Sequence, residues 1–377
     1  MLIVALSLAG AGCSLTEKKV TKTGFSLEPR MAANATHFGI VYYHRPTAGS
    51  TLRIDAVKLD ANGQIVAAKQ GLASITGAYA PFWLSDLVWS DSAQQFAFAY
   101  SEGKAIKFVR LDASLTQIGS PLTIKFNLVP DQHPYLEDLS LVWNGKDQQY
   151  CLAFVTKHYT TSPDIHDDLY VSQISPGGDF IGSYARRVLV IGNCHRTSIA
   201  YNTQTGKYAV AYFHDLLPKL GVFDVAGGWA TEYPVTSSTY KTWKEAIRLL
   251  CDQTSGEFFV AEISYAGELD WHVMSKTGAA LGKSFNEGKG FERLFSLATL
   301  ASGFAPNAVV AASQYQKIRY WLITEKGPGT PSDALAPTSG AFNSSPTMVV
   351  AGGVFLAWIQ DEMLYFGRVK IDWPPSK

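Results

Sequence analysis

One short segment recurs along almost the whole chain, and it constrains the fold more than any other feature. Its copies read FGIVYY, QFAFAY, QYCLAF, KYAVAY, EFFVAE, NAVVAA and VFLAW. The alternation of apolar residues in these copies predicts half-buried β-strands. One apolar anchor from each copy gives the series Val41, Ala99, Ala153, Ala211, Ala261, Ala311 and Ala357. The anchors are spaced by roughly fifty residues, which indicates a modular repeat.

Each unit has the same internal order. An apolar strand ends in LVW, LVW, IAY or LLC about ten residues before the anchor, and a polar turn such as SDSAQQ or NTQTGK follows it. This pattern predicts a hairpin whose second strand carries the anchor. A third strand ends in VKLD, VRLD, SQIS or VMS and leads into a turn with glycine, as in DANGQI and SPGGDF. A weaker fourth strand completes the unit.

Four antiparallel strands repeated in seven units predict an all-β chain folded as a seven-bladed β-propeller. Six blades remain the alternative, because ATLASGFAPNAVVAASQYQ fits the repeat least well. The last unit ends without room for a fourth strand, and VTKTGFSLEP, which starts at residue 20, has no other partner. We expect an N-terminal strand to close the last blade. The predicted organisation is a leader and linker at 1–19 and a single propeller domain at 20–377.

The first residues, MLIVALSLAGAGCSL, have the apolar run and small residues of an export signal. Ala11 and Gly12 before Cys13 resemble the lipobox of bacterial lipoproteins, which implies lipidation of Cys13. The alternative is an ordinary cleaved signal. Either interpretation predicts an exported protein, anchored in the cell envelope or secreted, that meets a membrane only through an N-terminal lipid.

The repeat units lack the signatures of several well-known propellers. There is no Trp-Asp repeat, no double-glycine kelch pattern and no Ser-x-Asp-x-Gly-x-x-Trp box. The units resemble the loosely repeated propellers of bacterial exported proteins and lipoproteins. This resemblance implies a fold and a compartment, and it implies no chemistry.

Charge and motif content narrow the function classes. Lys plus Arg equals Asp plus Glu at 32 each, so the basic excess of a nucleic-acid-binding protein is missing. No Gly-x-Ser-x-Gly, His-Glu-x-x-His or Cys-x-x-Cys motif occurs, so enzymatic activity is left uncertain and binding is favoured. Cys151 and Cys251 fall at core-strand positions, and Cys194 is expected in a loop beside His195. The redox state of these three cysteines is left open.

The stretch TKHYTTSPDIHDDLY, residues 156–170, lengthens the third unit between its second and third strands. We predict a long loop there, on the face that carries the blade-to-blade connections. The candidate ligand-binding residues on that face are His133, Tyr135, His158, Tyr159, Asp164, His166, Asp167, Asp168, His195 and His214. Imidazole and carboxylate groups suit a divalent metal, with His158, His166 and Asp168 as candidate ligands. No cofactor is firmly implied, and a plain polar loop is the alternative.

These observations predict an exported, lipid-anchored binding or interaction module that uses its loop-rich face to contact a protein or a glycan. One alternative is a carbohydrate-active hydrolase or lyase of the cell envelope. Another is a structural subunit of an envelope complex. The fold cannot decide among them, because propellers serve all three roles.

Overall fold

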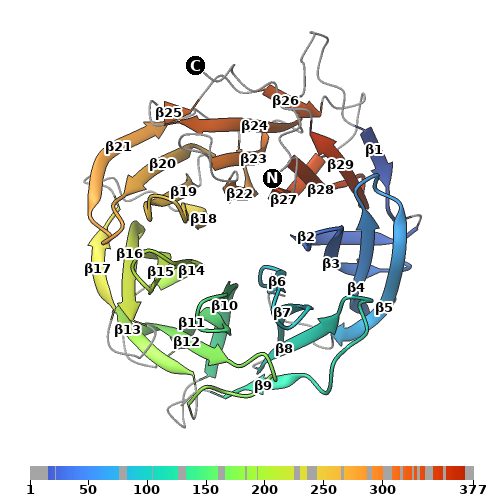
Figure 1. Ribbon diagram of the computed structural model, residues 1–377, viewed down its shortest axis with the longest axis horizontal. Coiled ribbons are helices and arrows are strands. Elements are labelled where there is room, and N and C mark those ends of the chain that lie inside the picture. The colour runs from blue at the N-terminus through green and yellow to red at the C-terminus, as the bar shows by residue number, and fades with distance from the viewer. Residues whose placement is uncertain are drawn as a thin grey trace.

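The computed structural model describes 16–21, 23–75, 83–103, 105–125, 133–159, 166–182, 185–192, 194–224, 230–235, 244–264, 267–286, 291–299, 308–314, 317–324, 327–328, 332–335, 343–350 and 354–369. Within these ranges the strands form seven antiparallel sheets. The sheets stand in a ring around a central axis, each with one strand innermost (Figure 1).

The first four sheets follow chain order. The first sheet contains β2 (Phe25–Ala33), β3 (His37–Arg45), β4 (Leu52–Asp60) and β5 (Ile65–Ile75). The second contains β6 (Val88–Ser90), β7 (Gln95–Glu102), β8 (Ala105–Asp112) and β9 (Leu122–Ile124). The third contains β10 (His133–Asn144), β11 (Gln149–Tyr159), β12 (His166–Ile174) and β13 (Arg186–Gly192). The fourth contains β14 (Cys194–Asn202), β15 (Lys207–His214), β16 (Leu217–Asp224) and β17 (Thr231–Pro234).

Three more sheets complete the ring. The fifth contains β18 (Lys244–Cys251), β19 (Phe258–Ser264), β20 (Leu269–Met274) and β21 (Ala280–Asn286). The sixth contains β22 (Phe291–Thr299), β23 (Ala308–Gln314), β24 (Lys317–Thr324), β25 (Gly327–Pro328) and β26 (Ser332–Leu335). The seventh contains β27 (Asn343–Val350), β28 (Val354–Gln360), β29 (Met363–Val369) and β1 (Thr16–Lys19).

The anchor residues mark the second strand of each sheet. They lie on β3, β7, β11, β15, β19, β23 and β28. Every anchor is fully buried, with 0% of its surface exposed. Small or branched side chains suit these positions, because each second strand lies between two neighbouring sheets and packs against both. The strand pattern inferred from the repeat is confirmed at these positions.

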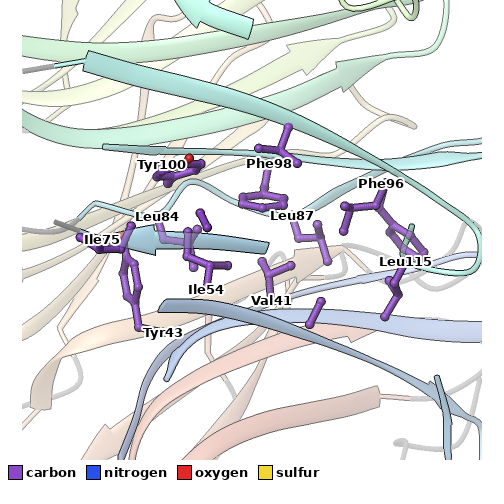
Figure 2. Packing of buried hydrophobic residues seen from close by; sticks show 14 of the residues in the cluster. Val41, Tyr43, Ile54, Ile75, Leu84, Leu87, Phe96, Phe98, Tyr100 and Leu115 are labelled. Atoms are coloured by element: carbon purple, nitrogen blue, oxygen red, sulfur yellow. The ribbon is translucent and has the colours of Figure 1, made fainter. Parts of the chain in front are cut away.

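Buried apolar clusters join neighbouring sheets around the ring. Between the first and second sheets, Val41 and Ile54 on one side meet Phe96 and Phe98 on the other (Figure 2). Comparable clusters occupy the other interfaces, including the one between the seventh and first sheets. Since each sheet buries both faces against its neighbours, the hydrophobic effect stabilises the ring as a whole rather than each sheet alone.

The repeated Asp or Ser at the end of the third strand has a local cause. The Asp60 carboxylate accepts hydrogen bonds from the backbone N–H groups of Asn62 and Gln64 at 2.9 and 2.8 Å. Asp112 caps the corresponding turn of the second sheet in the same way. In the fifth sheet, Ser275 does so with its hydroxyl. These side chains fix the turn into the outermost strand.

The closing strand differs from the prediction. It is β1, which pairs with β29 from Thr16 opposite Arg368 to Lys19 opposite Tyr365. Residues 16–19, predicted as part of the leader and linker, form this strand. Part of VTKTGFSLEP instead belongs to β2, the innermost strand of the first sheet.

The least regular unit departs from the uniform four-stranded pattern. It forms its own sheet, in which β25 and β26 both pair with β24. The prediction of four strands in every blade is therefore wrong for the sixth sheet, which has five. Its short outer pieces pair with different parts of β24, so no single fourth strand forms.

Two further findings concern the cysteines and the membrane. Cys151 and Cys251 are free thiols buried in strands, as predicted for core positions. Cys194, expected in a loop, is the first residue of β14. No helix in the described part of the chain is long and apolar enough to cross a bilayer.

Candidate functional site

Irregular pairing shapes the innermost strands. The register of β2, β10, β14 and β18 with the next strand shifts at a β-bulge. At three of these bulges a charged residue has a positive φ: Glu28 at 46°, Asp138 at 61° and Arg196 at 58°. This conformation is uncommon for residues other than glycine and concentrates at functional sites. A bulge also redirects its side chain relative to the regular ladder.

Charged residues on or beside the innermost strands of several sheets interact electrostatically with one another. We call this set the axial cluster, and its members are Glu28, Arg30, Asp86, Asp138, Arg196 and Arg248. Arg248 on β18 interacts electrostatically with residues of the first, second, third and fourth sheets or the segments entering them. Five of the six residues lie on β2, β10, β14 and β18, which are the innermost strands of four different sheets (Figure 1).

Burial among these charges shifts two pKa values. Burial raises the pKa of Glu28 above its ordinary value, and the neighbouring Asp138 adds to the rise while Arg30 opposes it. The Glu28 side chain is still 27% exposed. Burial lowers the pKa of Arg248, and repulsion from Arg30 and Arg196 acts in the same direction. Desolvation therefore disfavours the charged forms of both groups.

Backbone donors fix the orientation of the carboxylates. Asp138 accepts hydrogen bonds from the N–H of Leu139 at 2.9 Å and the N–H of Thr197 at 3.2 Å. The Ser140 hydroxyl donates to Asp86 at 2.7 Å. These contacts link the second, third and fourth sheets at the axis, so both aspartates are held in place before any ligand binds.

An aromatic residue holds one arginine. The Arg196 guanidinium carbon lies 4.8 Å from the centre of the Trp83 ring, within the range of a cation–π contact. Trp83 is itself fixed, because its indole N–H donates to the Leu136 carbonyl at 2.7 Å. Arg196 of the fourth sheet is thereby oriented by the segment that leads into the second sheet.

Part of the predicted site lies at the end of one hairpin. Strand pairing sets His158 opposite His166, Lys157 opposite Asp167, and His133 opposite Tyr159. The predicted long loop is therefore mostly strand: 156–159 belong to β11 and 166–170 to β12. The backbone brings together these candidates: His133, Tyr135, His158, Tyr159, His166 and Asp167. Asp164 lies outside the described residues.

The metal set stays a prediction, because the side chains of His158 and His166 lie outside those that the structure describes. Among the described side chains, no group of three or more His, Cys, Asp or Glu has metal-binding geometry. Asp168 is buried and forms an ion pair with Arg187 at 3.3 Å, with the Tyr170 hydroxyl at 3.5 Å from the same oxygen. These contacts give Asp168 a structural role in the third sheet.

The last two candidates have packing partners of their own. His195 is buried, with its ring centre 5.3 Å from that of Phe213. His214 Nδ1 lies 3.3 Å from Glu232, which also accepts a hydrogen bond from the Tyr212 hydroxyl at 2.6 Å and pairs with Lys219 at 3.2 Å. The hydrogen bond with His214 is the main reason that the pKa of Glu232 is lowered to about 2. This group forms a polar network on the fourth sheet.

Sequence reasoning missed the axial cluster. Its signal is a charged residue a few positions before the aromatic end of an innermost strand. Asp86, Asp138 and Arg196 occupy such positions ahead of Trp89, Trp143 and Tyr201. The signal is weak because the charge changes sign from one unit to the next.

Comparisons with known proteins bear on the fold. No protein-family model matches the chain, and no curated protein sequence matches it. The Dos1 propeller aligns with a TM-score of 0.53 and 8% identity over 93% of each chain. This chain has a β-propeller fold. A periplasmic gluconolactonase from Pseudomonas aeruginosa, PpgL, aligns with this propeller at TM-score 0.52 and 10% identity, over 82% of this chain and 88% of its own. An intramolecular trans-sialidase from Ruminococcus gnavus aligns at TM-score 0.50 and 10% identity, over 94% and 96%. At sequence identities of 8 to 10%, the structural similarity indicates a shared fold and gives no information about activity.

Proposed function

We propose that this propeller is an exported binding module whose contact surface is the axial cluster with the strand ends around it. The observation that carries the proposal is the convergence of charges of both signs from different sheets. Burying charged groups costs free energy, and apolar residues could fill the same positions. Groups with perturbed pKa values that cluster in this way are candidates for recognition or catalysis.

The position of the cluster connects it with the face predicted from the sequence. Strand β10 begins at His133, opposite Tyr159 near the end of β11. Asp138 follows five residues later along the same strand, or about 17 Å at the usual rise per residue. A ligand at the axis would thus be approached from the face that carries the β11–β12 hairpin end.

Thermal unfolding of a protein beginning at residue 14 tests this proposal. The panel contains neutral and acidic soluble saccharides, zinc, calcium and EDTA. A compound that binds only the folded state, at about a hundred times its dissociation constant, adds about 2.7 kcal/mol of stability. We expect Asp138→Asn and Arg248→Gln to abolish the shift, and Arg368→Gln on the exposed surface of β29 to keep it.

The same measurements can locate the binding site elsewhere if the axial site is wrong. A shift that survives both axial substitutions would refute the axial site. His158→Ala and His166→Ala would then test the hairpin end. If no compound shifts the unfolding temperature, the remaining candidate ligand is a protein, and crosslinking in the native envelope would identify it.

A second candidate function is hydrolysis of a glycan or lactone. It is favoured by the pairing of Glu28, whose pKa is raised, with the second carboxylate Asp138. A carboxyl group kept protonated can act as a general acid beside another carboxylate. Two propellers of similar fold are named as a gluconolactonase and a trans-sialidase. Turnover that falls at least about a hundredfold in Glu28→Gln would favour this function, and no turnover on the panel would count against it.

Export and lipidation form the remaining part of the proposal. The apolar leader and the AGC sequence ending at Cys13 support them. Expression in a bacterial host, followed by membrane fractionation and mass spectrometry of the N-terminal peptide, tests the anchor. We expect a lipid on Cys13 and release of the protein from membranes in Cys13→Ser. An unmodified residue 13 in the wild type would contradict the lipoprotein interpretation.

A further inference from the structure

Four large apolar side chains are well exposed in the described part of the chain. They are Ile65, Val66, Ile181 and Leu281, with exposed fractions of 40 to 52%. All of them follow the turn after the third strand of a sheet, in the first, third and fifth sheets. A single exposed apolar side chain needs no explanation, but here one position recurs in sheets on different sides of the ring (Figure 1).

A local irregularity accompanies these side chains. Strand pairing skips Val66 in the first sheet and skips Leu281 and Gly282 in the fifth. Ile181 likewise precedes a glycine with positive φ, Gly182 at 99°. A Cβ added at Gly182 or Gly282 would have no atom within 4 Å, so the surface beside the preceding aliphatic residue is open. Burial between sheets therefore does not account for the apolar character of these positions.

The turns that carry these residues share one end of the ring. In the first sheet the strands are antiparallel, so the β3–β4 turn lies at one end of β4 and the β4–β5 turn at the other. We call the end with the β4–β5 turn, and with its equivalents in the other sheets, the turn face. The loop-rich face predicted from the sequence is the opposite end, which carries the blade-to-blade connections.

The closing strand begins at the turn face. Thr16, the first residue of β1, pairs with Arg368 near the end of β29, which is the third strand of its sheet. The β4–β5 turn is a neighbour of this strand, because a Cβ added at Gly63 would lie 3.3 Å from the Lys18 side chain. The chain therefore enters the propeller beside the turn that leads to Ile65 and Val66.

We propose that the turn face docks on a lipid membrane, with Val66, Ile181 and Leu281 entering its interfacial layer. This inference rests on the proposed lipidation of Cys13. Cys13 precedes Thr16 by three residues, so an extended chain would place its lipid at most about 11 Å from the start of β1. A membrane that holds this lipid lies beside the turn face, where the exposed aliphatic side chains are.

The distribution of the aliphatic residues favours a membrane over a smaller partner. They belong to three sheets on different sides of the ring (Figure 1), and a flat, extended surface can meet all of them at once. A single acyl chain gives only marginal membrane binding, so a second apolar contact strengthens the attachment.

Charge does not drive this docking. Lys plus Arg equals Asp plus Glu at 32 each, and the turn face carries acidic caps such as Asp60 and Asp112. Anionic lipid is therefore not required. We expect vesicles of phosphatidylcholine alone to suffice.

Quenching of a fluorescent label by brominated phosphatidylcholine tests the orientation. The full-length protein with its lipid, reconstituted into vesicles, carries bimane at Ala61→Cys in the β4–β5 turn or at Ala48→Cys in the β3–β4 turn. Both alanines are exposed and lie at opposite ends of the first sheet. Strand β4 has nine residues, so Ala48 would stand about 30 Å farther from the membrane. We expect quenching at Ala61→Cys and none at Ala48→Cys above the background of the unsubstituted protein.

A triple variant and a matched control test the side chains. Val66→Ser, Ile181→Ser and Leu281→Ser together should reduce quenching of the Ala61→Cys label to background. The control replaces three exposed polar residues of the same turns and keeps the net charge: Gln64→Ser, Asp179→Ser and Lys276→Ser. It should keep the quenching. Both triple variants should have the urea midpoint of the wild type, because every replaced side chain is exposed.

Three outcomes would overturn the docking proposal. One is equal quenching at the two label positions, or stronger quenching at Ala48→Cys. Another is quenching at Ala61→Cys that the apolar triple variant leaves unchanged, which would mean that the anchor alone sets the orientation. The third is a dimer in solution that the apolar triple variant dissociates, without quenching, which would make the turn face a contact between copies of the chain.

Mass spectrometry of residue 13 separates this inference from the lipidation on which it rests. If Cys13 carries no lipid, the same labelled proteins are mixed with an excess of brominated vesicles. Quenching confined to Ala61→Cys would then keep the membrane-docking face while the lipoprotein proposal fails. No quenching of the unlipidated protein would overturn both.

Discussion

Replacing Glu232 by Gln tests the electrostatic network on the fourth sheet. The pKa of this carboxyl is lowered to about 2, first by the hydrogen bond with His214 and further by Tyr212 and Lys219. Against an ordinary value of 4.5, this corresponds to about 3 kcal/mol of stability at neutral pH. The Glu232 side chain is 28% exposed, so solvent screening reduces the expected contribution to about 2 kcal/mol.

The sign of the pH dependence follows from the lowered pKa. The contribution of Glu232 is complete above its unfolded-state pKa of 4.5 and is lost as pH falls toward about 2. Urea unfolding at pH 7 should therefore show Glu232→Gln less stable than wild type by about 1 to 2 kcal/mol, since Gln keeps one acceptor. The difference should shrink steadily when the measurement is repeated between pH 4.5 and pH 3.

A control on the same sheet sharpens the test. Asp224 forms an exposed ion pair with Lys207 at 3.5 Å, so Asp224→Asn should cost less than about 0.5 kcal/mol. Equal costs for Glu232→Gln and Asp224→Asn at pH 7 would refute the reasoning. So would a cost for Glu232→Gln that does not change with pH.

Two further predictions concern packing and thiol reactivity. Gly278→Ala should destabilise the fold by about 2 kcal/mol, because φ is 99° and the added Cβ would lie 2.5 Å from Tyr233. Gly282→Ala should cost only about 1 kcal/mol, because Gly282 also has a positive φ but no atom lies within 4 Å of the added Cβ. Equal urea midpoints for the two variants would contradict the packing argument. Burial raises the pKa of Cys251 to about 12 and that of Cys151 further, so peptide mass mapping should find both unlabelled by iodoacetamide at pH 8 until the protein unfolds. Rapid labelling of either thiol in the folded protein would show that its strand opens.

The repeat could be predicted because its signal is local. Each anchor is an apolar residue in an alternating strand, and burial between two sheets requires that alternation. The position of the closing strand was not predicted, because its sequence, TEKK, is polar and lacks apolar alternation. A polar sequence is ordinary in the outermost strand of a sheet, where lysine discourages pairing with other chains.

The site was harder to predict for two physical reasons. The β11–β12 hairpin carries polar residues typical of a loop, but pairing of Thr156 with Asp168 and of Lys157 with Asp167 extends both strands. Tertiary pairing there overrides composition. The axial cluster depends on bulges, and each bulge shifts the alternation of its strand by a single residue, as between Leu136 and Leu139 of β10, which is too short a signal to recognise in the sequence.

The bulges of the inner strands have a consequence for the evolution of this protein. Asp138 and Arg196 occupy corresponding bulges, in β10 and β14, yet they carry opposite charges. A bulged residue has no partner opposite it in the ladder, so its identity is uncoupled from the apolar packing between sheets. Substitutions that tolerate a positive φ, such as Asn or Gly, can therefore change the chemistry presented by these strands while the ladder keeps its pairing. A library at the bulges restricted to such residues would explore new specificities at the lowest cost to folding.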